Sequence, residues 1–163
     1  MPPPIESCRR SAGCWKAFPK TSPTSLAGWS RKIRLGDTEA LLLSNLAGQM
    51  PGGLDNVAAA GCYPVPRQDS HAWFAVAGPA AKDCLAKLCG VDLRPRAFTA
   101  GAVAQCGFAG ISAIVIRDDA LTGYHLLADS ASAGYLWDCL IDAMAEYGGG
   151  PVGRAGLVKD SNR

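Results

Sequence analysis

Residues 71–93, HAWFAVAGPAAKDCLAKLCGVDL, decide how this chain folds. Apolar and aromatic side chains dominate the beginning of the stretch and predict a β-strand over residues 73–77. Pro79 then suits the first turn of a helix, and Gly90 suits the residue after its end. Between them, apolar side chains recur at helical spacing, at Ala80, Cys84, Leu85, Leu88 and Cys89. The stretch therefore predicts a strand followed by a helix.

The chain after this helix predicts three more strands and a second helix. Residues 102–108, 111–117 and 124–128 are apolar runs separated by turn sequences. Ser130 or Ser132 is suited to cap the last helix, which Gly148 and the glycines after it end. Its apolar stripe repeats every three or four residues, at Tyr135, Leu136, Cys139, Leu140, Ala143, Met144 and Tyr147. Residues 71–147 are thus predicted to form one compact βαβββα unit.

Upstream of this unit, residues 33–35 and 40–44 predict two strands joined by the turn sequence GDTE, which favours a hairpin. We expect three regions: an irregular Pro-rich arm over residues 1–30, a single α+β domain over 31–149 and a flexible tail over 150–163. The expected fold is an antiparallel sheet with helices packed on one face. A ferredoxin-like or split βαβ arrangement would satisfy this pattern.

Composition restricts the classes of function. Only 18% of the 163 residues are charged, against about 25% in ordinary soluble domains, and the formal net charge is +2. A surface covered by partner subunits would explain the low charge, and so would an Ala- and Gly-rich genome. The basic residues are scattered, which argues against nucleic-acid binding. The sequence has no apolar run of about 20 residues that would span a membrane. Its start lacks the apolar region of a signal peptide, so we expect a cytoplasmic protein with seven reduced cysteines.

Candidate cofactor and metal motifs in this sequence are weak. Gly148, Gly150 and Gly153 match G-x-G-x-x-G, but they follow a predicted helix and enclose Pro151, whereas a dinucleotide-binding loop follows a strand. Cys84 and Cys89 are five residues apart, so they do not stack on one helix face, and no C-x-x-C pair accompanies them. Buried cysteines are the expected interpretation.

The remaining candidates are histidines and acidic residues. His71 and His125 are the only histidines, and a Cys–His nucleophilic pair stays open, although no cysteine has an activating local sequence. Asp118 and the adjacent Asp119 are expected in a solvated turn. A second group, Asp92 with Arg94 and Arg96, follows the first helix and could clamp an anion or a partner carboxylate, or could be a surface link. We therefore assign no catalytic, cofactor-binding or metal-binding residue.

Four segments, taken in order, resemble the gamma subunit of heterotetrameric sarcosine oxidase. That subunit is similar to the folate-binding module of the glycine-cleavage aminomethyltransferase. The resemblance is strongest in AVAGPAA, VAQ and YLWDCLIDA and covers about two thirds of the chain. The long Pro-rich start departs from the family pattern at the place of the first strand–helix unit of the module. The four segments are residues 35–44, 71–93, 98–118 and 124–149.

The resemblance implies an accessory chain without an active site of its own. In this family the alpha subunit carries NAD and a tetrahydrofolate-binding domain, the beta subunit carries FAD and shares FMN with alpha, and the small delta subunit holds zinc. The gamma subunit packs mainly on alpha. The family reaction is oxidative demethylation of sarcosine to glycine, with transfer of a one-carbon unit to tetrahydrofolate and formation of hydrogen peroxide.

Three alternatives to this interpretation stay open. The chain could be the small subunit of a related N-methyl amino acid dehydrogenase, because the segments do not separate oxidases from dehydrogenases. It could also be a stand-alone folate-binding one-carbon protein. A thiol-dependent enzyme is the third alternative. For the leading interpretation we expect an α+β scaffold whose apolar surface meets larger partner chains.

Overall fold

The computed structural model describes residues 29–44, 63, 65–119 and 122–153. Most of the predicted N-terminal arm, the segment over residues 45–62 and the last ten residues of the predicted tail lie outside the described residues. The chain divides into two compact units, Met1–Pro66 and Arg67–Arg163. Each unit is described by itself.

The first unit contains the predicted hairpin. Strand β1 (Trp29–Arg34) pairs antiparallel with β2 (Ala40–Ser44), and β1 begins four residues before the predicted start at residue 33. Arg34 fastens the connecting turn, because its guanidinium donates to the Gly36 carbonyl at 3.0 Å and to the Asp37 carboxylate at 2.7 Å. The local pattern of two apolar runs around GDTE is therefore sufficient to specify this element.

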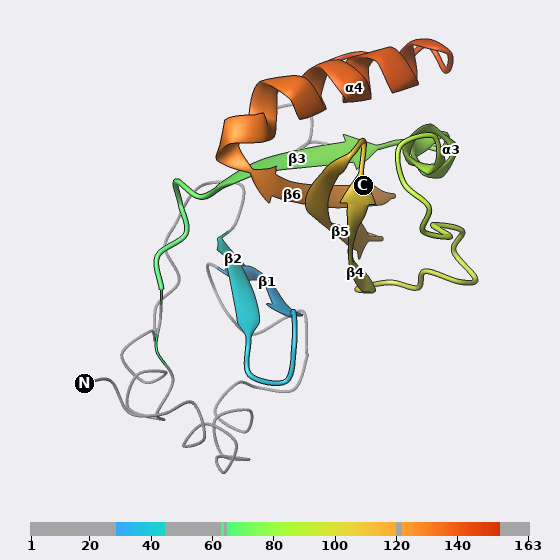
Figure 1. Ribbon diagram of the computed structural model, residues 1–163. Helices are drawn as coiled ribbons and strands as arrows, with labels where there is room; N and C mark the ends of the chain where they lie inside the picture. The colour runs from blue at the N-terminus through green and yellow to red at the C-terminus, as the bar shows by residue number, and fades with distance from the viewer. Residues whose placement is uncertain (1–28, 45–62, 64, 120–121, 154–163) are drawn as a thin grey trace. The chain divides into compact units, whose positions relative to one another are not determined.

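The second unit is built on a four-stranded antiparallel sheet in the order β3-β6-β5-β4, shown in Figure 1. All four strands fall where the sequence predicts them, to within two residues at each end. The α+β class with an antiparallel sheet is confirmed. The strand bounds are β3 (His71–Ala77), β4 (Val103–Phe108), β5 (Ile111–Asp118) and β6 (Gly123–Asp129).

Strand order refines the ferredoxin-like expectation. A split βαβ unit places one strand between two parallel strands that a helix connects. Here β6 and β5 lie between β3 and β4, and antiparallel pairing throughout makes β3 and β4 antiparallel to each other. The unit is a β4-β5-β6 meander whose last strand pairs with β3, which gives the βαβββα order.

Two helices cover one face of this sheet, α3 (Ala81–Ala86) and α4 (Ala133–Ala145). The prediction that α3 continues to Gly90 is wrong. The helix ends at Ala86 because the chain then turns to form a bridge between Cys89 and Phe108 of β4, supported by a hydrogen bond from Ala109 N to Leu88 O at 2.7 Å. Tertiary pairing here overrides helical periodicity.

The start of α4 also differs from expectation, whereas its end does not. The short helix η2 (Ser130–Ser132) precedes α4, and the Asp129 carboxylate caps it by accepting from Ala131 N at 2.8 Å. Ser132 occupies the N-cap of α4 without a side-chain hydrogen bond. The glycine signal at the other end is confirmed, because Gly148 has a φ of 66°.

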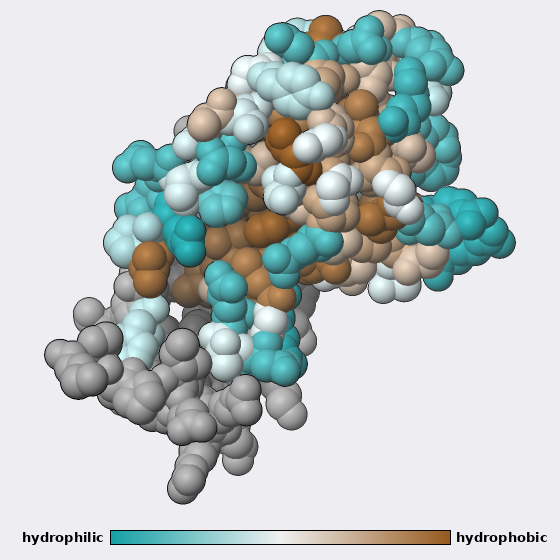
Figure 2. Space-filling model, viewed as in Figure 1, coloured by the Kyte–Doolittle hydropathy of each residue, from teal (hydrophilic) through white to brown (hydrophobic). Residues whose placement is uncertain are grey.

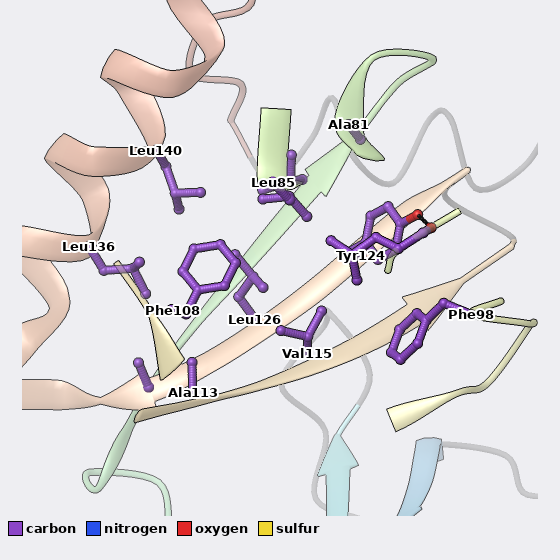
Figure 3. Close-up of a cluster of buried hydrophobic side chains, with 13 residues drawn as sticks. Ala81, Leu85, Phe98, Phe108, Ala113, Val115, Tyr124, Leu126, Leu136 and Leu140 are labelled. Carbon is purple, nitrogen blue, oxygen red and sulfur yellow. Dashed lines mark hydrogen bonds between the residues drawn. The ribbon is translucent and has the colours of Figure 1, made fainter. Parts of the chain in front are cut away.

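The hydrophobic core lies between the sheet and the two helices, as Figure 3 shows. Alternate residues of each strand face the helices, because side chains alternate across a strand. Leu136 and Leu140 of α4 meet Phe108, Val115 and Leu126 of the sheet there. The Tyr124 hydroxyl, also in this layer, donates to the Leu93 carbonyl at 2.6 Å. The segment after α3 is thereby fixed to the core.

Candidate functional site

The opposite face of the sheet carries a row of three polar or aromatic side chains. Trp73 of β3, His125 of β6 and Asp118 of β5 lie diagonally across three neighbouring strands. This placement follows from register, because His125 pairs with Ala75 on one side and with Ile116 on the other. Trp73 and Asp118 each stand two positions from those partners and so share the His125 face.

Hydrogen bonds connect the three side chains in series. The Trp73 indole Nε1 donates to His125 Nδ1 at 3.1 Å, and His125 Nε2 lies 2.9 Å from Asp118 Oδ2. The rings of Trp73 and His125 meet edge to face at 5.4 Å. His125 is 3% exposed and Asp118 is 5% exposed. Because Nδ1 accepts from the indole, the imidazole proton is on Nε2 and is donated to the carboxylate.

This arrangement has a direct chemical consequence for His125. Both ring nitrogens are engaged by protein groups, so neither is available to take a proton from a nucleophile or to bind a metal without breaking a contact. Paired and hydrogen-bonded in this way, a buried imidazole and carboxylate satisfy each other. The geometry is that of a structural cluster and not of an open acid–base site.

The prediction that Asp118 lies in a solvated turn is wrong. Strand β5 continues through Asp118, which pairs with Gly123 at the start of β6. The added strand residue turns the Asp118 carboxylate toward His125 and into the sheet face. Asp119 behaves as predicted, since its carboxylate is exposed and binds the Arg117 guanidinium at 2.9 Å.

The open possibility of a Cys–His pair finds no support among the described residues. His71 and His125 belong to the face opposite the helices, and the Ser70 hydroxyl lies 2.8 Å from His71 Nδ1. The described cysteines lie on α3, on α4, after α3 and on the core side of β4, so the sheet separates them from His125. These four are Cys84, Cys89, Cys106 and Cys139.

Two of these thiols, Cys84 and Cys106, have surroundings that disfavour the thiolate. Burial raises the pKa of the Cys84 thiol, although Lys87 opposes the effect in part. The pKa of Cys106 is also raised, first by burial and then by the neighbouring Cys89 thiol. No group of three or more His, Cys, Asp or Glu side chains suited to a metal occurs in the described part of the chain.

The predicted anion clamp after α3 is occupied by its own carboxylate. Arg94 grips Asp92 with two charge-assisted bonds, Nε to Oδ1 at 2.7 Å and Nη2 to Oδ2 at 2.5 Å, and the Arg94 amide adds a third at 3.1 Å. These bonds lower the Asp92 pKa to about 2. Arg94 is therefore neutralised locally, and Arg96 is exposed beside it.

A shallow depression of about 270 Å³ lies between the start of α3, the segment after it and the β5–β6 turn. Its basic groups are Lys82 and Arg117, each already paired with a carboxylate, Asp83 at 2.5 Å and Asp119 at 2.9 Å. Sequence reasoning missed this depression because the lining residues come from segments far apart in the chain.

Exposed aromatic side chains occur on helix α4 and just after it. Tyr135 and Trp137 are 54% and 43% exposed, and Tyr147 just after the helix is 40% exposed. Trp137 lies over Phe74 of the edge strand β3, with ring centroids 6.3 Å apart. Figure 2 shows hydrophobic and pale side chains interspersed with hydrophilic ones over the visible face. Exposed aromatic residues of this kind are enriched at protein interfaces.

These features define a class: a small α+β module with a well-formed core, a closed His–Asp cluster and exposed aromatic residues. The sequence profile described as the GCVT N-terminal domain matches residues 38–158, which is most of the chain. The chain belongs to the GCVT N-terminal domain family.

Two individual proteins are similar to this chain. An aminomethyltransferase from Saccharopolyspora erythraea is 28% identical over 123 residues, which cover 74% of this chain and 34% of that protein. This chain thus spans about a third of the curated relative. A solved heterotetrameric sarcosine oxidase from Corynebacterium sp. U-96, in complex with pyrrole 2-carboxylate, contains a chain with a TM-score of 0.67 and 24% identity. The match covers 87% of this chain and 76% of that chain.

The match to the GCVT N-terminal domain confirms the aminomethyltransferase-like family that the resemblance implied, and the solved structure confirms the fold. In the described residues, no helix is long and apolar enough to cross a membrane.

Proposed function

We propose that this chain is a non-catalytic, gamma-type subunit of a sarcosine-oxidase-like heterotetramer. Within it, the alpha subunit makes the main contact, and beta and delta complete the assembly. The complex oxidatively demethylates sarcosine to glycine, passes the one-carbon unit to tetrahydrofolate and forms hydrogen peroxide. FAD, FMN, NAD, tetrahydrofolate and zinc are held by the partner chains. This chain contributes a stable surface on which the partner subunits pack.

The main observation behind this proposal is that the side chains of the His125 cluster are hydrogen-bonded to one another and buried. His125 is the only described histidine buried beside a carboxylate, and both its ring nitrogens are hydrogen-bonded within the protein. A one-carbon transferase or an amine oxidase needs a group free to exchange a proton with its substrate. In the described residues, the Trp73–His125–Asp118 cluster instead links three neighbouring strands of the sheet.

Surface composition supports a partner-facing role. Charged residues are 18% of the chain, and Tyr135 and Trp137 on α4, with Tyr147 just after it, expose aromatic rings. Strand β3 forms one edge of the four-stranded sheet, and its sequence HAWFAVA has no charge, proline or bulge to block pairing. A subunit that is always assembled tolerates such a surface, whereas a free monomer normally protects it.

Purification from the native host tests the proposal. The affinity-tagged full chain should bring down two large flavin-containing chains and a small cysteine-rich chain, and the assembly should consume oxygen when sarcosine is added. The chain expressed alone should show neither flavin absorbance nor amine oxidation. Tight flavin retention or turnover by the isolated chain would overturn the proposal. An assembly that reduces an artificial acceptor but not oxygen would identify the dehydrogenase alternative.

A second candidate is a stand-alone folate-binding one-carbon protein. The likeness to an aminomethyltransferase favours it, although only about a third of that protein is represented here. Calorimetric titration of tetrahydrofolate into the purified full chain separates the two candidates. Saturable binding in the micromolar range would favour the second candidate, and no binding by the free chain agrees with the subunit proposal.

A further inference from the structure

Two half-buried thiols from distant segments meet at the outer edge of β4. Cys89 forms an isolated antiparallel bridge with Phe108, and Cys106 stands two residues before Phe108 on the same strand. Cys106 and Phe108 therefore point to the same side of β4. Both cysteines pack against the same hydrophobic core and are free thiols. They are diagonal neighbours on one face of a short ladder.

We propose that Cys89 and Cys106 form a reversible disulfide by exchange with a low-molecular-weight disulfide. The Cys89 thiolate attacks one sulfur of the small disulfide and releases one small thiolate, leaving a mixed disulfide on Cys89. The Cys106 thiolate then attacks the Cys89 sulfur and releases the second small thiolate. Two electrons pass from the protein pair to the small disulfide, and its two released thiolates take up the two protons that the protein thiols give up, which makes two small thiols.

The order of the two attacks follows from the environment. Burial, and then the neighbouring Cys89 thiol, raises the pKa of Cys106 above its ordinary value, so Cys106 is a poor first nucleophile and acts as the resolving thiol. Other described thiols have no such partner from a distant segment: Cys84 lies on the buried side of α3, and Cys139 lies on α4 near Tyr135.

The position of Cys89 allows the sulfurs to approach. A disulfide requires the two Cβ atoms to come within about 4.5 Å. Cys89 lies beyond the end of α3, in a turn attached to β4 by its bridge and by one adjacent hydrogen bond. The turn is also tied to α3, because Leu88 N and Cys89 N both donate to the Leu85 carbonyl, at 3.0 and 3.2 Å. The bond would close the loop between the cysteines, which carries the core residues Leu93 and Phe98, and would stabilise it.

Peptide mapping of the full chain tests this proposal. After exchange with oxidised glutathione, remaining thiols are alkylated and the folded protein is digested with trypsin. Cleavage at lysine and arginine, but not between Arg94 and Pro95, places Cys89 in peptide 88–96 and Cys106 in peptide 97–117. We expect these two peptides cross-linked about tenfold or more above any other pair of described cysteines, because the fold holds them together.

Two variants and one further measurement complete the experiment. Cys106→Ser should leave a mixed glutathione disulfide on Cys89, whereas Cys84→Ser, the matched control on α3, should retain the cross-link. The oxidised chain should melt several degrees higher than the reduced chain, reversed by dithiothreitol. In denaturant the preference for this pair should disappear. Separate peptides in the folded wild-type chain, or equal cross-linking among all cysteines, would overturn the proposal. It is independent of the proposed function.

Discussion

Trp73 and His125 are joined across adjacent strands by a hydrogen bond from the indole nitrogen to Nδ1 at 3.1 Å. Through this bond Trp73 fixes which nitrogen of the imidazole carries the proton, since a protonated Nδ1 would oppose the indole N–H. The tautomer in turn directs His125 Nε2 at Asp118. One aromatic residue of an edge strand therefore orients a buried pair on the two central strands.

Replacing Trp73 by Phe should destabilise the protein by about 1–2 kcal/mol, because His125 Nδ1 would lose its donor within a buried site. Trp137→Phe is the matched control, since Trp137 is 43% exposed and makes only a ring contact with Phe74. We expect its effect to stay within about 0.5 kcal/mol. Urea unfolding followed by circular dichroism measures both variants. Equal losses would contradict the role given to the indole N–H.

Asp118 and Asp119 offer a second matched comparison, because two adjacent carboxylates have opposite environments. Asp118→Ala should cost about 2–3 kcal/mol, since it leaves the His125 Nε2–H buried without its acceptor. Asp119→Ala removes an exposed ion pair with Arg117 and should cost no more than about 0.5 kcal/mol. Chemical denaturation of both variants is the measurement. A larger loss from Asp119→Ala would show that the buried pair does not matter.

The sequence was sufficient to predict the strands of this fold because their signals are local. Alternation, turn residues and the hairpin sequence GDTE depend only on neighbouring residues, and each predicted strand is present within a few residues. The arrangement of the strands was harder to predict, since pairing of β3 with β6 joins segments about 50 residues apart. Neither strand contains a local sequence signal that identifies the strand with which it pairs.

Features that depend on a single boundary residue escaped prediction. The burial of Asp118 rests on β5 continuing one residue further than its apolar run, and strand ends are uncertain to more than one residue. Helix α3 ends early because Cys89 forms a bridge with Phe108. The helical spacing of apolar residues gives no indication of this long-range pairing. The His125 cluster could be predicted only by knowing which face of the sheet His125 occupies. Because β6 is buried on both faces, its sequence does not alternate between apolar and polar residues and does not indicate that face.

Gly123 is predicted to tolerate no side chain. A Cβ atom there would lie 2.3 Å from the Val76 carbonyl oxygen and 2.8 Å from Ala77 Cα, and both are backbone atoms that cannot move independently of the sheet. Gly123→Ala should therefore destabilise the fold by about 3 kcal/mol or more. Gly107→Ala in β4 is the control, because a Cβ atom at that position would meet nothing within 4 Å. Thermal unfolding compares the two, and a neutral Gly123→Ala would refute the close packing of β3 on β6.

Cys84 provides a prediction that depends on pH. Burial raises its pKa above the ordinary thiol value of 9.0, so at about pH 8 the folded thiol is ionised less than the unfolded one. Since the thiolate is the reactive form, iodoacetamide should modify Cys84 more slowly in the folded chain than in urea. The difference should narrow as the pH rises through the folded-state pKa. Mass spectrometry of peptide 83–87 follows the reaction.

The same shift has a definite sign for stability. Well below pH 9 the thiol is protonated in both states, and the contribution of Cys84 to folding is complete. Above that pH the unfolded chain loses the proton first, so the contribution declines as the pH rises toward the folded-state pKa. Cys84→Ser, which does not ionise in this range, should weaken this part of the alkaline decline. A folded Cys84 that reacts faster than the unfolded thiol would instead support a thiol-dependent enzyme.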